Sequence, residues 1–198
     1  MPMEATPAIK KTLESKGVTI NAHTPILLHR TISTAAGGIL KTGFRTRLEK
    51  YGQMAAVATI HFDVNHASFK EGLDSKHQSS THNMVMMVPE GIHEQLNAQL
   101  APHDVKVKPQ RRLEAIAEAL GGTLPREWVV GTYAQDKGKF TPNKNFDPTH
   151  QPTFTHLSQL VTNLEANKKW QESLGPVRTP EIQKTPKPKK GKKETFFF

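Results

Sequence analysis

The chain contains no cysteine among its 198 residues. This absence excludes a disulfide framework, a zinc site built on thiolates and a cysteine nucleophile. A chain of this length can bury enough apolar surface to fold without such cross-links. We therefore expect its stability to come from an ordinary hydrophobic core.

Long apolar runs are also missing. Nowhere do about eighteen apolar residues follow one another, which is the length that a membrane-spanning helix needs. The first twenty residues lack the apolar stretch of a secretory signal. We expect a protein that is made in the cytosol and has no membrane span; if it is exported, a specialised secretion system must read some other signal.

The formal net charge of +9 is concentrated near the C-terminus. Seven Lys and Arg and two Glu lie between Pro176 and Phe198, which leaves only +4 for residues 1–175. This distribution weakens the case for a basic nucleic-acid-binding face on the folded part. Nucleic acid is expected as a partner only through the tail, whose basic stretch "PKPKKGKK" has no interleaved aromatic residues.

Composition and pattern divide the chain into an N-terminal extension (1–25), one domain (26–174) and a basic tail rich in Pro, Lys and Thr (175–198). Helical signals and spacing occur over 8–17, 33–44, 65–77, 90–100, 109–122 and 154–170. Strands are expected over 24–32, 54–62, 83–89, 104–108 and 127–133. Because the two kinds of element do not alternate strictly, the sequence predicts an α+β fold.

Three of these segments carry more specific expectations. The continuous apolar run of residues 83–89 predicts a strand that is covered on both faces. The alternation in residues 104–108 predicts an edge strand. Ser33 or Thr34 is expected to cap the helix that follows, and the pair Gly43 and Phe44 to end it.

The ten histidines could indicate a metal site, but their spacing does not favour one. His61 and His66 are five residues apart, as are His77 and His82, and no pair has the helical spacing of a zinc site with an acidic neighbour. The spacing favours histidines scattered over the surface and no metal.

The segment "EALGGTLPREWVVGTYAQDKGKFTPNKNF" (118–146) resembles the stretch that follows the catalytic glutamates in the cholera toxin A chain and heat-labile enterotoxin family of ADP-ribosyltransferases. A second match lies upstream, in "LLHRTISTAAGGILKTGF". There, as in that family, an arginine on a strand (Arg30) precedes the Gly-Phe end of a helix, with Phe44 fourteen residues after it. The resemblance spans about 120 residues, from Ile26 to Phe146.

This resemblance implies the ADP-ribosyltransferase fold, in which two small β-sheets pack around a cleft for nicotinamide adenine dinucleotide (NAD). It implies transfer of ADP-ribose from NAD to a protein acceptor of a host cell, by a bacterial toxin or effector. Breaking the bond between nicotinamide and ribose develops an oxocarbenium ion, which a carboxylate beneath the ribose stabilises.

The resemblance also assigns residues to the NAD site. Arg30 would hold the pyrophosphate with its planar fork. Of the family's Ser-Thr-Ser strand only Thr59 survives as a hydroxyl. His29 is an alternative to Arg30, because the diphtheria-like branch of the superfamily uses a histidine on the same strand.

The catalytic carboxylate is where the sequence departs from the family. Counting back from the two glycines, the family's glutamate falls on Ile116, and its acidic neighbour falls on Glu114. Glu114 and Glu118 are therefore the catalytic candidates, with Glu127 as the acid to consider if neither acts. The departure leaves a rival hypothesis open, namely a catalytically inactive member of the same fold that serves as a protein-binding module.

Overall fold

A computed structural model describes residues 5–46, 59–75 and 80–173. The strands are β1 (Pro25–Thr31), β2 (Phe44–Arg45), β3 (Ile60–Asp63), β4 (His82–Met86), β5 (Thr123–Leu124), β6 (Val129–Ala134) and β7 (Lys139–Pro142). The α-helices are α1 (Ala5–Ser15), α2 (Ser33–Thr42), α3 (Ala67–Asp74), α4 (Ile92–Leu100), α5 (Arg112–Ala119) and α6 (Leu157–Ser173). Short 3₁₀ helices are η2 (Ala101–His103), η3 (Pro109–Arg111) and η4 (Arg126–Trp128).

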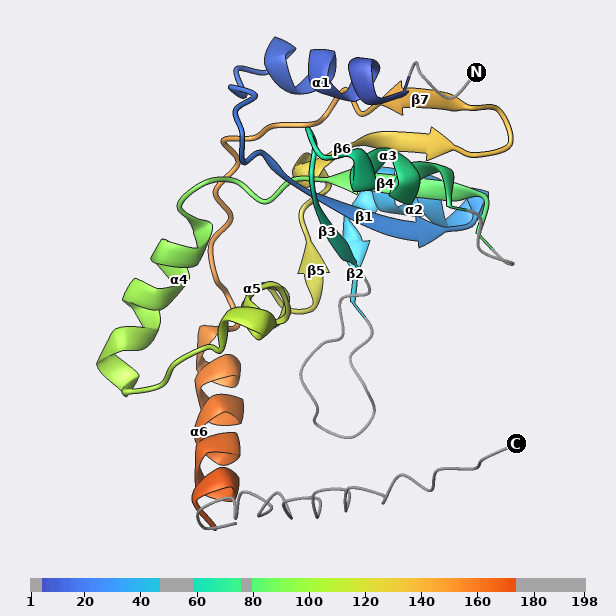
Figure 1. Cartoon of the computed structure of the whole chain (residues 1–198). Helices are drawn as coiled ribbons and strands as arrows, with labels where there is room; N and C mark the ends of the chain where they lie inside the picture. The colour runs from blue at the N-terminus through green and yellow to red at the C-terminus, as the bar shows by residue number, and fades with distance from the viewer. Residues whose placement is uncertain (1–4, 47–58, 76–79, 174–198) are drawn as a thin grey trace, which may run out of the picture.

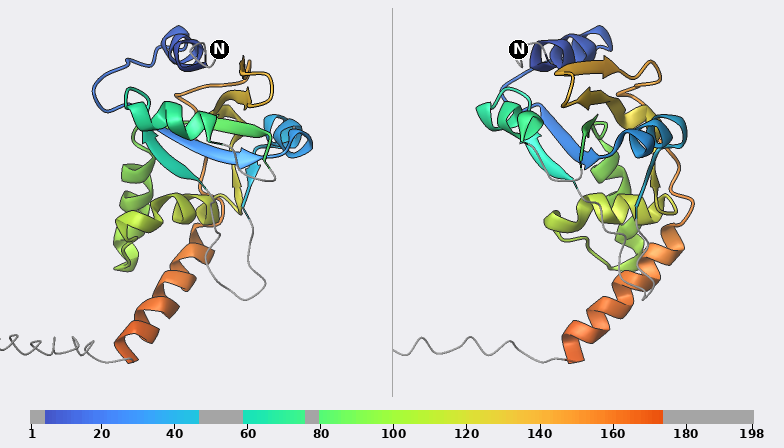
Figure 2. Two further views of the ribbon diagram at one scale, coloured as in Figure 1. Left: turned by 45° about the vertical axis from the view of Figure 1, so that its right-hand side comes forward. Right: turned by 90° about the vertical axis from the view of Figure 1, so that its right-hand side faces the viewer.

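The strands form two separate sheets. Five of them make an antiparallel sheet in the order β3-β1-β4-β6-β7, and β2 pairs with β5 in a second sheet of two strands (Figure 1). The predicted mixed α+β class is confirmed. Views from three directions place α1 on one side of the large sheet and α4, α5 and α6 on the other (Figures 1 and 2).

Each face of the large sheet buries its own hydrophobic core. The small core lies under α1 and α3 and includes Ile9, Leu13, Leu28, Phe69 and Tyr133. The large core lies between the sheet and α2, α4, α5 and α6, and includes Leu27, Met84, Ile116, Trp128 and Leu160. Because strand side chains alternate between faces, the core to which a strand residue belongs tells which way it points.

Strand β4 occupies the middle of the sheet, as its apolar run predicts. Met84 and Met86 point into the large core and Val85 into the small core, and all three are buried. The one polar residue inside the strand, Asn83, is also fully buried. Its Nδ2 donates to the Leu73 carbonyl at 2.8 Å, and this bond satisfies the C-terminal end of α3.

The predicted helices are present, with ends that differ by a few residues. Helix α1 places Ile9 and Leu13 fully inside the small core, so it belongs to the folded unit. Helix α6 buries Leu160 and Val161 on its predicted apolar face. Among the residues that the structure describes, none of the helices combines the length and the apolar character that crossing a bilayer requires.

Two local predictions are wrong. Residues 105–108 form no strand; Val105 and Val107 pack against the large core, which explains their alternation without any strand to pair with. Neither Ser33 nor Thr34 caps α2, because its N-cap residue is Ile32, which makes no side-chain cap bond. The N-terminal part of the predicted strand 54–62 and the basic tail lie outside the described residues, and the part that is described forms β3.

Candidate functional site

The two sequence segments that carry the resemblance meet in the second sheet. Phe44 pairs with Leu124 and Arg45 with Thr123 in antiparallel register. Immediately after β2, the Thr46 amide donates to the Gly122 carbonyl at 2.9 Å, and the Thr46 hydroxyl donates to the same oxygen at 3.0 Å. The helix end at residues 43 and 44 and the "ALGG" turn are about 80 residues apart in the chain, yet they form one local structure.

Gly43 makes this junction possible. Its φ of 90° and ψ of 173° lie in a region that other residues rarely adopt. A Cβ at this position would stand 2.4 Å from the Leu124 carbonyl oxygen and 3.3 Å from the Arg126 amide nitrogen. The turn therefore needs glycine both for its backbone conformation and for the close approach of β5.

His29 faces this junction. Leu27 belongs to the large core, so strand alternation directs His29 to the same face. Its ring meets Phe44 edge to face, with ring centroids 4.4 Å apart and an interplanar angle of 74°. Thr59 directly precedes β3, whose first residue, Ile60, pairs with Leu28. Continued by one residue, that register brings Thr59 opposite His29.

Arg30 points to the opposite face of the sheet. It shares the side of Leu28 and lies in register with Asn83, which in turn pairs with Tyr133. Its Nε is buried and finds no hydrogen-bond partner among the described residues. The structure thus separates the two candidate NAD-binding residues of β1, with Arg30 on the small-core face and His29 beside β2.

Glu118 is held between two helices. The residue is only 5% exposed, and the Asn163 Nδ2 on α6 donates to Oε1. The other carboxylate oxygen is buried with no hydrogen-bond partner within the described ranges. Burial raises the pKa of Glu118, while the Asn163 bond acts in the other direction.

The other positions of α5 also differ from what the resemblance implies. Ile116, which occupies the place of the family's glutamate, is fully buried in the large core. Glu114 is half-buried one helical turn before Glu118 and shares its face. Since both belong to the helices beneath the sheet and Arg30 points to the other side, the structure does not bring Arg30 together with Glu114 or Glu118.

Another carboxylate lies beside the junction. Glu127 belongs to η4, immediately after the loop that leaves β5. The Arg126 Nε donates to its Oε1 at 3.1 Å, and the Arg126 Nη1 donates to the Lys41 carbonyl at the end of α2 at 3.3 Å. These contacts attach Arg126 and Glu127 to the same helix end that Gly43 terminates.

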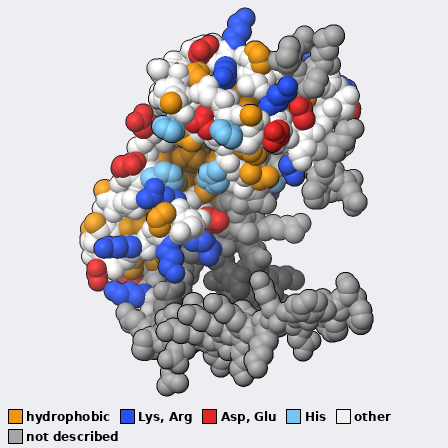
Figure 3. Space-filling model, viewed as in Figure 1, with side chains coloured by type: hydrophobic (Ala, Val, Ile, Leu, Met, Phe, Trp, Pro, Cys, Tyr) orange, Lys and Arg blue, Asp and Glu red, His pale blue; other side chains and the backbone are white. Residues whose placement is uncertain are grey.

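A separate cleft opens between the large sheet and helices α4 and α5. It has a volume of about 1260 Å³, and three histidines from different parts of the chain line it: His23, His61 and His93. Figure 3 shows histidine side chains gathered around a hollow with hydrophobic side chains inside it. Sequence reasoning missed this group, because the three residues are 38 and 32 positions apart and share no motif.

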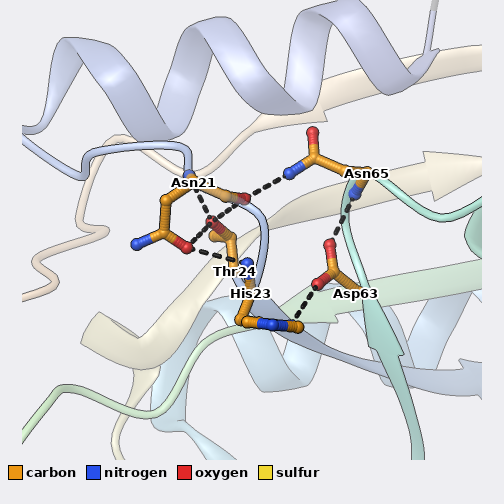
Figure 4. A network of polar contacts seen from close by, with 5 residues as sticks. All are labelled: Asn21, His23, Thr24, Asp63 and Asn65. Carbon is orange, nitrogen blue, oxygen red and sulfur yellow. Dashed lines mark hydrogen bonds and ion pairs between the residues drawn. The ribbon is translucent and has the colours of Figure 1, made fainter.

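One wall of the cleft is fixed by a network of polar contacts (Figure 4). The Asn21 amide donates to the buried Thr24 hydroxyl at 3.0 Å, and the Asn65 Nδ2 donates to the Asn21 carbonyl. Asp63 accepts from the Asn65 amide at 2.9 Å and lies 3.8 Å from the His23 ring nitrogen. The loop before β1 is thereby attached to the end of β3.

No group of three or more His, Cys, Asp or Glu side chains within residues 5–46, 59–75 and 80–173 is arranged to hold a metal ion. Comparison of the chain with protein-family models, with curated proteins and with solved structures finds no match.

Proposed function

We propose that this chain is a mono-ADP-ribosyltransferase that moves ADP-ribose from NAD to a protein acceptor. The observation that carries the proposal is the pairing of β2 with β5, which joins the two segments resembling the cholera toxin family. The fold that the resemblance implies also has two sheets, and the described residues form one sheet of five strands and one of two. The described contacts support a reacting site at this junction.

His29 and Thr59 are the candidates for binding NAD at the junction. Both lie on or next to β1 on the side of β2, and Phe44 fixes the ring of His29 edge to face. An imidazole can donate a hydrogen bond to the ribose or to the nicotinamide amide, and a threonine hydroxyl can orient a carboxylate. This arrangement favours the diphtheria-like assignment of His29 over the pyrophosphate role of Arg30.

Glu127 is the carboxylate that the contacts favour. In the reaction, the bond between nicotinamide and the ribose C1′ breaks, and nicotinamide leaves with the electron pair. The acceptor nucleophile then bonds to C1′ and loses its proton. A carboxylate beside C1′ offsets the positive charge of the ribose between these events. Glu127 lies next to the junction, whereas Glu118 is held by Asn163 under α6.

A second candidate function is the catalytically inactive protein-binding module. The observation that favours it is the core position of Ile116, where the family has its glutamate. In this case the junction of β2 and β5 would serve only as scaffold.

Release of nicotinamide from NAD, measured by chromatography, separates the two functions. The transferase predicts slow release by the wild type and a loss of two or more orders of magnitude in Glu127→Gln, without a change in melting temperature. Glu114→Gln removes an equal charge from α5 and serves as the matched control. Absence of release together with absence of a thermal shift in excess NAD would favour the inactive module. Loss of activity in Glu114→Gln or Glu118→Gln instead would assign the carboxylate to α5.

A further inference from the structure

The histidine-lined cleft lies at the other end of β1 from the proposed NAD site. Its lining includes Leu27 and residues from the loop before β1, whereas His29 meets β2 near the end of the strand. An inference about the cleft therefore does not depend on the proposed function.

The cleft has the character of a small-molecule site. Its apolar lining includes Leu27, Met87, Val88 and Leu113, and polar side chains from several elements also line it. Binding pockets for small molecules typically combine a mostly apolar surface with a few convergent polar groups. A volume of about 1260 Å³ is sufficient for a ligand with an aromatic or aliphatic body.

One residue of this lining, His93, has a buried polar atom that lacks a hydrogen-bond partner among the described residues. His93 is half-buried, and its Nδ1 is buried without a hydrogen-bond partner among the residues that the structure describes. A buried polar group without a partner costs free energy. A ligand that accepts a hydrogen bond from this nitrogen would remove that cost.

The charges around His93 depend on protonation. Arg112 of α5 and His61 of β3 line the same cleft and act on the charge of His93, and Glu94 follows it on α4. Burial, Arg112 and His61 lower the pKa of His93, whereas Glu94 raises it. The remaining charged groups of the lining are Lys16 and Glu90, with His23 next to Asp63.

These charges balance while the histidines are neutral. Lys16 and Arg112 then offset Glu90 and Glu94. A proton on a histidine adds one positive charge to the lining. Asp63 offsets the charge of a protonated His23. An anion would offset the charge that a proton adds at His61 or His93, and its binding would in turn favour the protonated form of these two histidines.

From this combination we infer that the cleft binds a small organic anion with an apolar body, with His61, His93 and Arg112 meeting the anionic group. Binding takes up protons on the histidines and is therefore stronger at mildly acidic pH.

Titration calorimetry with 2-naphthalenesulfonate tests this inference, because the charge of that probe is constant between about pH 5.5 and 8. The expected affinity is at least tenfold higher at about pH 5.5 than at about pH 8. Measurements in buffers of different ionisation enthalpy should detect the uptake of protons on binding. The neutral analogue 2-naphthol should bind weakly at both pH values. A ring-current shift of the Met87 methyl resonance would locate the probe in the cleft.

Three variants complete the test. His61→Gln and His93→Gln should each weaken binding severalfold at about pH 5.5 and flatten its pH dependence. His103→Gln removes an exposed histidine that is not in the lining, and it should bind as the wild type does. His61 is exposed, so its variant tests the inference even if His93→Gln fails to fold. The inference would be overturned if the probe did not bind or bound equally well at both pH values. It would also be overturned if His103→Gln lost as much affinity as His61→Gln and His93→Gln.

Discussion

His29 and Arg30 are neighbours in sequence, but they face different parts of the molecule. One meets Phe44 at the junction of the two sheets, and the other lies in register with Asn83 on the small-core face. His29 can therefore contact a ligand at the junction, whereas Arg30 cannot unless the strand rotates.

This difference predicts opposite outcomes for two substitutions. His29→Ala should lower nicotinamide release from NAD by at least tenfold, because it removes the ring beside Phe44. Arg30→Lys should retain most of the activity. Steady-state assays of both variants, with melting temperatures as the control for folding, check the prediction. The reverse order of effects would assign NAD binding to Arg30, as the cholera-like assignment requires.

Because Glu118 is buried, we expect the free energy of unfolding to depend on pH. Burial raises its pKa above the ordinary value of 4.5, so the folded state retains a proton at pH values where the unfolded state has lost it. This proton stabilises the fold fully at pH values below the pKa that Glu118 has in the unfolded chain. The stabilisation is lost as the pH rises through the higher pKa of the folded state. Glu118→Gln should therefore be at least as stable as the wild type at neutral pH.

Chemical denaturation at about pH 4 and pH 7 measures this effect. Between these values the wild type should lose more stability than Glu118→Gln does. Glu114→Gln, which removes the same charge one turn away, should follow the wild type. A loss of more than about 1 kcal/mol in Glu118→Gln at neutral pH would show that the charged form stabilises the fold.

At the scale of elements, the junction of β2 and β5 depends on Gly43. Gly43→Ala should lower the free energy of unfolding by about 1–3 kcal/mol from backbone strain alone, and the contact with the Leu124 carbonyl adds to that loss. Gly37→Ala in α2 is the matched control, because nothing lies within 4 Å of its Cβ position.

The control should be neutral or more stable by about 0.5–1 kcal/mol, since alanine favours a helix interior. Thermal and chemical denaturation of both variants provide the comparison. Similar stabilities for the two variants would mean that the junction does not hold residue 43 in a conformation that only glycine adopts freely.

Local signals predicted most of the elements correctly. The apolar run of residues 83–89 predicted strand β4, and the glycine at position 43 predicted the end of α2. Both signals depend only on residues that are close in the sequence. Residues 104–108 were misread because alternation records only which side chains are buried, and Val105 and Val107 pack on the core without a neighbouring strand.

Contacts between distant residues could not be predicted in this way. Asn163 lies 45 positions from Glu118, and the cleft combines His23, His61 and His93. Only the packing of α6 on α5 and of α4 under the sheet creates these groups. The candidate site was therefore predictable as a set of motifs and not as an arrangement of side chains.

At the scale of the whole molecule, the described residues of both cores lie before the tail. The small core begins at Ala5, and the apolar residues that pack against the large core extend to Leu164. Deleting the tail (175–198) should therefore leave the melting temperature unchanged within about 2 °C, because the deletion removes none of the core residues that the structure describes. Differential scanning calorimetry of the shortened and full chains checks this. A drop of more than about 5 °C would show that the tail stabilises the folded unit.

The location of NAD on the molecule tests the central claim most directly. Amide chemical shifts of the isotope-labelled protein, recorded while NAD is added, report where the dinucleotide binds. A site at the junction of the two sheets predicts the largest changes at Phe44, Leu124 and Arg126, which surround Gly43. Changes confined to the opposite face of the sheet, around Asn83 and Tyr133, or no changes in excess NAD, would contradict it.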